Sequence, residues 1–229
     1  MPPPPTLPSH LVNTLNSHSA PVNAIAFSAI SGTYILTGSS DRQIHLSRTE
    51  PTSPDEHLPP IQKYVSHGYP VLDIAVSSDN KLFASVGGDR SVLLWHVQNA
   101  DGPLRRLGSN TNEGHSSRIN CVSFAGQDDS VLVSGSDDRS LRLWDMKSRD
   151  TRPLMAWVDA KDGISSLVVP GNGHSIVSGS VDGRVRSYDI RMGRVTIDAL
   201  PGPVTSLDAS RDAKLLLGEA RKWVMKTPS

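Results

Sequence analysis

Hydrophobic and polar residues alternate along much of this chain in short runs separated by turn residues. In one stretch, from Val133 to Asp145, an apolar run enters a Ser-Gly-Ser-Asp-Asp-Arg turn, and an alternating run follows that ends on Trp-Asp. Residues two apart lie on the same face of a β-strand, so this pattern predicts two strands joined by a tight turn. We therefore expect antiparallel sheet here rather than helix.

The same pattern occurs three more times, at Ala84 to His96, Val177 to Asp189 and, in a less regular form, Leu36 to Ser47. The turn aspartates are 44 to 49 residues apart, at Asp41, Asp89, Asp138 and Asp182. A repeat of this length with a Trp-Asp end is typical of the blades of a β-propeller. The sequence thus predicts an all-β fold, a β-propeller of four-stranded antiparallel blades.

Each repeat reads as an outer strand, a turn that carries histidine in the first three copies, and three further strands. The first outer strand is predicted at residues 11–15. The predicted repeats cover residues 10–48, 61–97, 104–146 and 154–190, with a partial fifth at 196–217. Residues 218–229 have neither the turn nor the alternation, so we expect an irregular tail there. The chain therefore holds about four and a half blades.

Two proline-rich segments interrupt this pattern. Residues 1–9 predict a disordered, extended tail, and residues 48–60 predict a loop between the last strand of one blade and the first of the next. Proline cannot donate a hydrogen bond to a neighbouring strand, which favours a loop in the second segment. Ser53-Pro54 and Thr227-Pro228 are weak candidates for proline-directed phosphorylation.

Composition and charge narrow the possible partners. The 229 residues include 23 Lys and Arg and 23 Asp and Glu, so bulk charge does not favour direct nucleic-acid binding. The single cysteine, Cys121, lies in an alternating run and is expected to be a buried, inert thiol in a reducing compartment. No apolar run approaches the roughly 18 residues of a membrane span, and the N-terminus lacks the features of a signal peptide. We expect a cytoplasmic and nuclear protein without a membrane partner.

Each repeat also supplies a serine or threonine four residues before the turn aspartate, and three supply a histidine upstream. An aromatic residue six positions after the aspartate completes the set in three repeats. We call each such group a tetrad; its members are His18, Thr37 and Asp41; His67, Ser85, Asp89 and Trp95; His115, Ser134, Asp138 and Trp144; and Ser178, Asp182 and Tyr188. Histidine, serine and aspartate together also suggest nucleophilic catalysis.

A structural role explains these groups better than catalysis. The aspartate can accept from imidazole, imidazole from the hydroxyl, and the hydroxyl from an aromatic N–H, so one chain of hydrogen bonds satisfies four buried groups. A hydrolase needs one exposed copy with an oxyanion hole rather than several embedded ones. The histidines belong to different blades and cannot share a metal. We therefore predict a protein that is not an enzyme, without cofactor, metal or small-molecule substrate. The first repeat has Ser47 in place of the aromatic, and the fourth lacks the histidine.

These residues make the chain resemble the Trp-Asp repeat propeller proteins, and two segments narrow the resemblance. Residues 67–73 with 87–90, and residues 159–166 with 179–193, resemble the second and fourth blades of the mitogen-activated protein kinase organiser family. The second match includes the missing histidine and the Tyr-for-Trp exchange. The resemblance implies a seven-bladed, non-enzymatic scaffold associated with kinases of the mitogen-activated cascade and with the spliceosome in mRNA splicing. Compared with that family, the chain resembles a C-terminally truncated product with an extra insert at 51–60.

Binding by such a scaffold would use the faces of the ring. Arginine and tyrosine are enriched at interface hot spots, and several lie in turns that should share one face. These candidates are Arg42, Tyr69, Arg90, Arg118, Arg139 and Arg184. They predict a basic surface for an acidic segment of a partner protein. The alternative, that they are solvated turn residues, remains open.

The alternative functions are a substrate receptor of a ubiquitin ligase and an enzyme of the propeller class. Tyr188-Asp189-Ile190-Arg191 and Trp144-Asp145-Met146-Lys147 resemble the Trp-Asp-x-Arg ends that substrate receptors of cullin-type ubiquitin ligases present to their adaptor, which would make Arg191 a binding residue. An enzyme of the propeller class is poorly supported, because no unpaired carboxylate cluster, phosphate loop or metal spacing is present.

Overall fold

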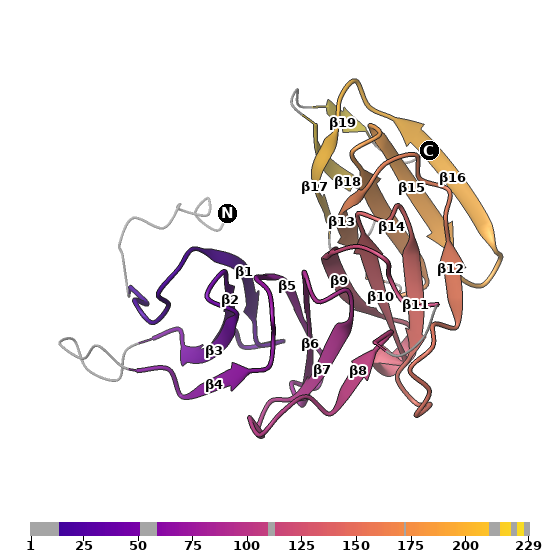
Figure 1. Cartoon of the computed structure of the whole chain (residues 1–229). Helices are drawn as coiled ribbons and strands as arrows, with labels where there is room; N and C mark the ends of the chain where they lie inside the picture. Colours follow the sequence, from indigo (N-terminus) through magenta and orange to yellow (C-terminus); the bar gives the residue numbers. More distant parts are fainter. Residues whose placement is uncertain are drawn as a thin grey trace, which may run out of the picture.

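The computed structural model describes residues 14–50, 59–109, 113–171, 173–210, 216–220 and 224–226. In these residues the chain forms five antiparallel sheets that follow one another side by side in an open arc (Figure 1). Four of the sheets have four strands and the last has three. The predicted all-β fold of propeller blades is confirmed.

The sheets are built from consecutive strands, and we number them blades one to five in chain order. Their strands are β1 (Val22–Phe27), β2 (Tyr34–Ser39), β3 (Gln43–Arg48) and β4 (Gln62–Val65); β5 (Val71–Val76), β6 (Leu82–Gly87), β7 (Val92–His96) and β8 (Arg105–Leu107); β9 (Ile119–Ala125), β10 (Val131–Ser136), β11 (Leu141–Asp145) and β12 (Met155–Trp157); β13 (Ile164–Val168), β14 (Ser175–Ser180), β15 (Arg184–Asp189) and β16 (Arg194–Ala199); β17 (Val204–Ala209), β18 (Leu216–Ala220) and β19 (Val224–Lys226). A single-turn 3-10 helix, Gln127–Asp129, follows β9.

Neighbouring blades pack through their first strands. The side chain of Val71 in β5 lies against Gly38 in β2, and Ile164 in β13 lies against Gly135 in β10. A Cβ atom at either glycine would come within 2.6 Å of the facing side chain, so these positions need glycine because the sheets approach closely there. The same contact occurs between Gly179 and Val204, whereas blade two has Val86 at this position, and an apolar layer is buried at each seam.

Hydrogen bonds across the seams add to the apolar packing. Their donors and acceptors are Asn23 to the Val71 carbonyl, Val122 N–H to the Asp73 carboxylate, Asn120 to the Ile164 carbonyl, Ser165 to the Val204 carbonyl, and Leu207 N–H to the Ser166 hydroxyl. Buried polar groups are costly without partners, so each of these bonds fixes how one blade is placed against the next.

Blade one lies at one end of the row, and this changes the exposure of its first strand. Ile25 is 61% exposed, whereas the equivalent Ile74 and Val122 in blades two and three are each 5% exposed. Phe27 is 58% exposed, against 8% for the equivalent Phe124. The sequence pattern is the same in all three strands, so the exposure follows from the position in the row.

Two boundaries differ from the sequence expectations. The range 218–229 was expected to be irregular, but the end of β18 and all of β19 lie in it. β18 pairs with β17 and β19 pairs with β18, so that expectation is wrong for those residues. Alternation is weak there, and pairing to the neighbouring strand supplies the order that the pattern lacks. The segment 48–60 joins β3 to β4 within blade one, not two successive blades. Its residues 51–58 lie outside the described residues.

Most of the other predictions for the termini and for the proline-rich segment concern residues that the structure does not describe. Residues 1–9, Ser53 and Thr227 fall outside the described residues, as do 11–13 of the predicted first outer strand, while Thr14 and Leu15 are not in a strand. Within the residues that the structure describes, no helix has the length and apolar character needed to cross a bilayer.

Candidate interaction surface

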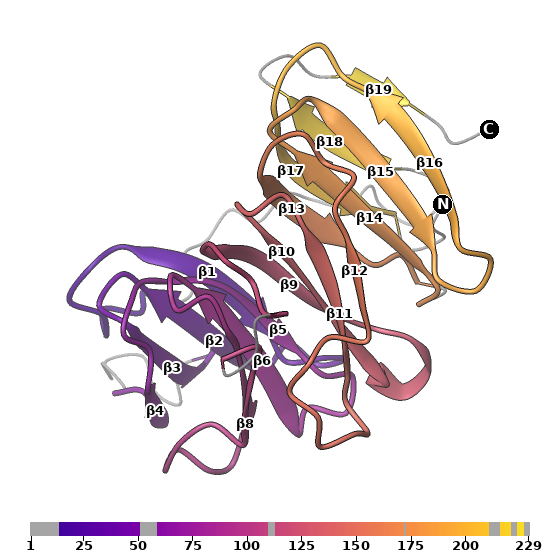
Figure 2. The same cartoon turned by 45° about the vertical axis from the view of Figure 1, so that its right-hand side comes forward.

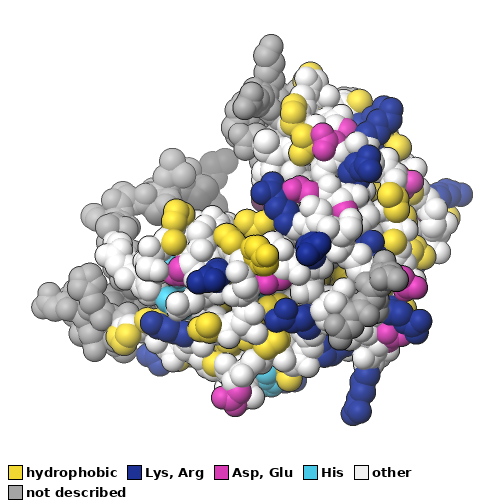
Figure 3. Space-filling model, in the orientation of Figure 1, with side chains coloured by type: hydrophobic (Ala, Val, Ile, Leu, Met, Phe, Trp, Pro, Cys, Tyr) yellow, Lys and Arg dark blue, Asp and Glu magenta, His cyan; other side chains and the backbone are white. Residues whose placement is uncertain are grey.

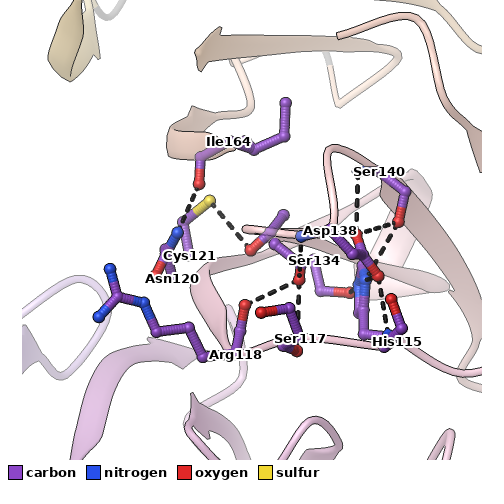
Figure 4. A network of polar contacts seen from close by, with 12 residues as sticks. His115, Ser117, Arg118, Asn120, Cys121, Ser134, Asp138, Ser140 and Ile164 are labelled. Carbon is purple, nitrogen blue, oxygen red and sulfur yellow. Dashed lines mark hydrogen bonds and ion pairs between the residues drawn. The ribbon is translucent and has the colours of Figure 1, made fainter. Parts of the chain in front are cut away.

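The tetrad of blade three links two strands and two turns through hydrogen bonds. The Nδ1 of His115 lies 2.9 Å from the Asp138 carboxylate, and its Nε2 lies 2.8 Å from the Ser134 hydroxyl. The indole N–H of Trp144 donates to the same hydroxyl over 2.9 Å. Ser140 and the Ser116 N–H also donate to Asp138, so the carboxylate is fully engaged (Figure 4). The network holds the turn before β9 against the turn between β10 and β11.

Blade two repeats this arrangement. His67 lies between Asp89 and Ser85, and the Trp95 indole donates to Ser85 over 2.8 Å. Trp95 also stacks on Phe83 and meets Tyr64 of β4 edge-on. The tetrad is therefore embedded in the apolar seam with blade one.

In blade one, which lacks the aromatic residue of the tetrad, a second histidine packs against the first. His18 bonds to Asp41 over 2.9 Å and to Thr37 over 2.8 Å, and His45 stacks on it with ring centroids 3.9 Å apart. Burial and the neighbouring His18 lower the pKa of His45 to about 4, so His45 is neutral at physiological pH. Ser47 stands at the aromatic position and makes no such contact.

Blade four replaces the histidine with an arginine from the strand. Ala160 occupies the histidine position, because the following Lys161 N–H bonds to Asp182 as Ser116 N–H bonds to Asp138. The fully buried guanidinium of Arg186 reaches Asp182 at 2.7 Å and also donates to the Asp159 carbonyl. Arg186 thus supplies the charge-assisted bond that imidazole supplies elsewhere. The Ser178 hydroxyl lies beside Tyr188, and no hydrogen bond joins it to Arg186 in the described residues.

The turn aspartates are ionised in this setting. Burial alone raises the pKa of Asp138, but hydrogen bonds from His115, Ser140 and the backbone outweigh it and hold the pKa well below its usual range. At Asp182 burial acts in the same direction, and the bonds from Arg186 and the backbone lower the pKa to about 2. Burial lowers the pKa of His115 despite Asp138, so the pair is a neutral imidazole beside a carboxylate. The pKa values of Asp41 and Asp89 are lowered as well, since hydrogen bonds again exceed the effect of burial.

This geometry fits a structural role for the His-Ser-Asp sets. The Ser85 and Ser134 side chains are fully buried, and each hydroxyl is already held between an imidazole and an indole. A nucleophile needs access to substrate and a donor pair for the developing oxyanion. Among the described residues, no group of three or more His, Cys, Asp and Glu side chains is placed to hold a metal ion.

The tetrads bring two sets of turns to one end of the blades, which we call the tetrad face. Arg42, Arg90 and Arg139 lie there with φ values of +71°, +57° and +71°, and all three side chains are exposed. The equivalent of these residues in blade four is Gly183, at +76°, which shows that the turn itself requires this conformation. Within the described part of the chain none of the three arginines forms an ion pair, whereas the adjacent aspartates are used internally.

The other candidate residues divide between the two faces. Tyr69 is 58% exposed on the tetrad face and packs over Gly88, and Arg118 is tied to Asp137 at 2.5 Å. Arg184 is half-buried at the start of β15 on the same face. Arg191 is exposed in the turn between β15 and β16, at the opposite end of the strands. Arg191 therefore does not share a surface with the other candidates.

Sequence reasoning missed three residues of this region. Arg186 and His45 complete the tetrads of blades four and one, and both occupy the position two before the aromatic site. Arg106, exposed on β8, reaches the Ser66 carbonyl and lies near enough to Asp89 to help lower its pKa. On the side of the molecule drawn in Figure 3, basic side chains are spread over several blades with acidic ones between them, so that side has no single large basic patch.

Known proteins are similar to this chain over most of its length. The family model for the WD domain, G-beta repeat, matches residues 9–46, 58–96, 108–145 and 152–189. The chain is similar to WD repeat domain-containing protein 83 of Rattus norvegicus, with 40% identity over 93% of this chain and 62% of the relative. It is 28% identical to a WD repeat domain-containing protein 83 homolog of Dictyostelium discoideum, over 93% of this chain and 69% of the relative. Autophagy-related protein 16 of Arabidopsis thaliana is 27% identical over 94% of this chain and 40% of the relative.

Proposed function

Because the chain belongs to the WD domain, G-beta repeat family, we propose that it is a non-enzymatic scaffold that brings other proteins together. The single observation that carries the proposal is the tetrad face. Its buried aspartates are hydrogen-bonded within the blades, while Arg42, Arg90 and Arg139 present their charges to solvent. Such a surface suits an acidic segment of a partner protein.

The finer assignment rests on resemblance. Residues 67–73 with 87–90 and residues 159–166 with 179–193 resemble the mitogen-activated protein kinase organiser family. Similarity to WD repeat domain-containing protein 83 of rat and Dictyostelium supports the same group of proteins. We therefore propose that the scaffold acts in a kinase cascade, in splicing assemblies or in both, in the cytoplasm and nucleus.

Reversing the charge of the tetrad face tests this function. In the triple variant Arg42→Glu, Arg90→Glu and Arg139→Glu, we expect most partner proteins recovered with the wild-type chain to be lost. Affinity purification from cells followed by mass spectrometry measures this, and a thermal melt by circular dichroism checks that the variant is folded.

A control carries the same type of substitution, at two positions instead of three, away from the face. Arg48→Glu with Arg149→Glu alters two exposed arginines at the opposite end of the strands and should retain the partners. If the triple variant folds and recovers the same kinase or splicing proteins as the control, the proposed role of this face is wrong. Recovery of a cullin adaptor instead would favour a ubiquitin-ligase receptor.

A further inference from the structure

The outer strand of blade four differs from the other outer strands. β16 has six residues, whereas β4 has four and β8 and β12 have three each. All six residues of β16 are exposed, and it ends its sheet, with β15 on one side and no strand of the described residues on the other (Figures 1 and 2). Short edge strands limit unwanted pairing, and long exposed ones are templates for another strand. β16 is therefore the edge best able to accept a partner.

The backbone of β16 shows which residues can bond outward. Leu200 N–H donates to the Gly183 carbonyl, and the register from Arg184↔Ala199 to Asp189↔Arg194 is regular. Main-chain groups alternate in direction along a strand, so residues 194, 196 and 198 face β15. The N–H and C=O groups of Val195, Ile197 and Ala199 face the open edge.

The side chains of β16 are self-complementary in one antiparallel register. When two copies of the strand are centred on Thr196, Arg194 of each lies opposite Asp198 of the other, and Val195 lies opposite Ile197. The charged pairs and Thr196 share one face, and the apolar pairs share the other, where Val195 is 40% and Ile197 52% exposed. Opposite charges and β-branched residues are favourable cross-strand pairs.

Backbone geometry permits few other registers. Outward-facing residues must pair with outward-facing residues, so the register can change only in steps that move the centre by one residue. Centring on Val195 or Ile197 loses the Arg194–Asp198 pairing, and centring on Arg194 sets like charges opposite each other. The register on Thr196 also places Val195 and Ile197 in the hydrogen-bonded pairs, as their backbone direction requires.

We propose that two copies of this chain associate through antiparallel pairing of their β16 strands, centred on Thr196. The partner is a second copy because its strand supplies the matching charge and apolar residue at each position. The contact is two-fold symmetric and joins two four-stranded sheets into one of eight strands. Such a contact buries little area compared with a stable dimer, so association is weak and depends on concentration.

Charge exchange tests the pairing. Sedimentation velocity over a concentration series should show a monomer–dimer equilibrium for the wild type. Arg194→Asp or Asp198→Arg alone puts like charges opposite each other and should raise the dissociation constant about tenfold or more. The double variant Arg194→Asp with Asp198→Arg restores both pairs and should return it to near the wild-type value.

A matched control separates the pairing of β16 from a general effect of charge. Arg149→Asp makes the same charge change at an exposed loop residue of blade three and should leave the equilibrium unchanged. A wild type that stays monomeric at every concentration, or a double variant as weak as the single ones, overturns the proposal.

Cross-linking tests the register directly. Two Thr196 residues in a non-hydrogen-bonded pair have Cα atoms about 4.5 Å apart, which is within the range for a disulfide. Thr196→Cys should form a covalent dimer under mild oxidation, whereas Arg149→Cys should not. Cys121 is buried and does not compete. Equal cross-linking by the two variants, or none by Thr196→Cys, would show that the strands do not meet at Thr196.

Discussion

Blades three and four place an aspartate at the same turn but satisfy it by different means. The side chains of Asp138 and Asp182 are each 7% exposed, and their partners His115 and Arg186 are each fully buried. His115 comes from the turn before the blade, 23 residues away, whereas Arg186 comes from the next strand, four residues away. The ionised aspartate is the shared requirement, and its donor differs between the blades.

Replacing histidine by arginine as the donor to the aspartate changes which other tetrad members are connected. In blade three the imidazole passes the network on to Ser134 and Trp144, so it links two strands and two turns. In blade four the guanidinium bonds to Asp182 and to the Asp159 carbonyl, and no hydrogen bond joins it to Ser178 in the described residues. A charged donor thus gives a stronger pair that ties fewer elements together.

The largest expected effect is the loss of the buried cation in blade four. Arg186→Leu installs the residue that blade two has at this position, Leu93, but leaves Asp182 buried and without its main partner. Removing one member of a buried ion pair costs about 3–5 kcal/mol. Chemical denaturation should therefore show a fall of roughly 3 kcal/mol in the free energy of unfolding.

The neighbouring arginine provides the control. Arg184→Leu removes an equal charge from a half-buried side chain that forms no ion pair in the described residues, and should change the unfolding free energy by less than about 0.5 kcal/mol. Equal effects of the two substitutions would mean that the Arg186–Asp182 pair has no special importance.

A smaller effect is expected for the aspartate of blade three. Asp138→Ala leaves His115, Ser140 and the Ser116 N–H short of an acceptor, which should cost about 2 kcal/mol or more. The melting temperature measures this, and Asp137→Ala, which breaks the exposed pair with Arg118 and one hydrogen bond from Asn120, is the comparison. An unchanged melting temperature for Asp138→Ala would contradict the network.

Converting blade four to the pattern of blade two tests whether histidine and arginine are equivalent donors to the turn aspartate. Ala160→His combined with Arg186→Leu places an imidazole between Asp182 and Ser178, the position that His67 holds between Asp89 and Ser85. Because bonds to charged groups contribute about 1.5–3 kcal/mol, the double variant should regain at least about 1.5 kcal/mol of the loss caused by Arg186→Leu. If Ala160→His restores nothing, the two donors are not interchangeable.

The sequence predicted the repeats and the tetrads because fixed spacings carried both. Serine stands four residues before the aspartate and the aromatic six after it, so strand alternation alone brings them together. Arg186 escaped notice because a charged residue in a strand is normally expected to face solvent. Alternation puts Arg186 on the same face as Tyr188, and this, together with the missing histidine, was the available signal. The order of residues 218–220 and of β19 could not be predicted, since it comes from pairing of β18 with β17 and of β19 with β18 rather than from a local pattern.

A charged and a neutral hydrogen-bond acceptor also stand at equivalent positions of two seams between blades. Asp73 accepts the Val122 N–H across the seam between blades two and three, at 2.8 Å. Ser166 holds the equivalent position and accepts the Leu207 N–H between blades four and five, at 3.0 Å. Burial raises the pKa of Asp73 to about 6, against the opposing bonds from the Val122 and Ile74 N–H groups. Asp73 is therefore the charged member of the pair and should make its seam sensitive to pH.

The smallest expected effect follows from this difference. A carboxyl whose pKa is raised on folding contributes stability that is full below its unfolded pKa, near 4, and is lost as pH rises through about 6. Asp73→Asn keeps an acceptor for Val122 and removes the charge, so it should stabilise the protein by about 1 kcal/mol at pH 8 and by less at pH 4. Ser166→Ala removes a neutral acceptor and should lower stability by a similar amount at both values of pH. Denaturation of both variants at pH 4 and pH 8 measures the difference, and a pH-independent effect of Asp73→Asn would show that this carboxyl ionises as it does in water.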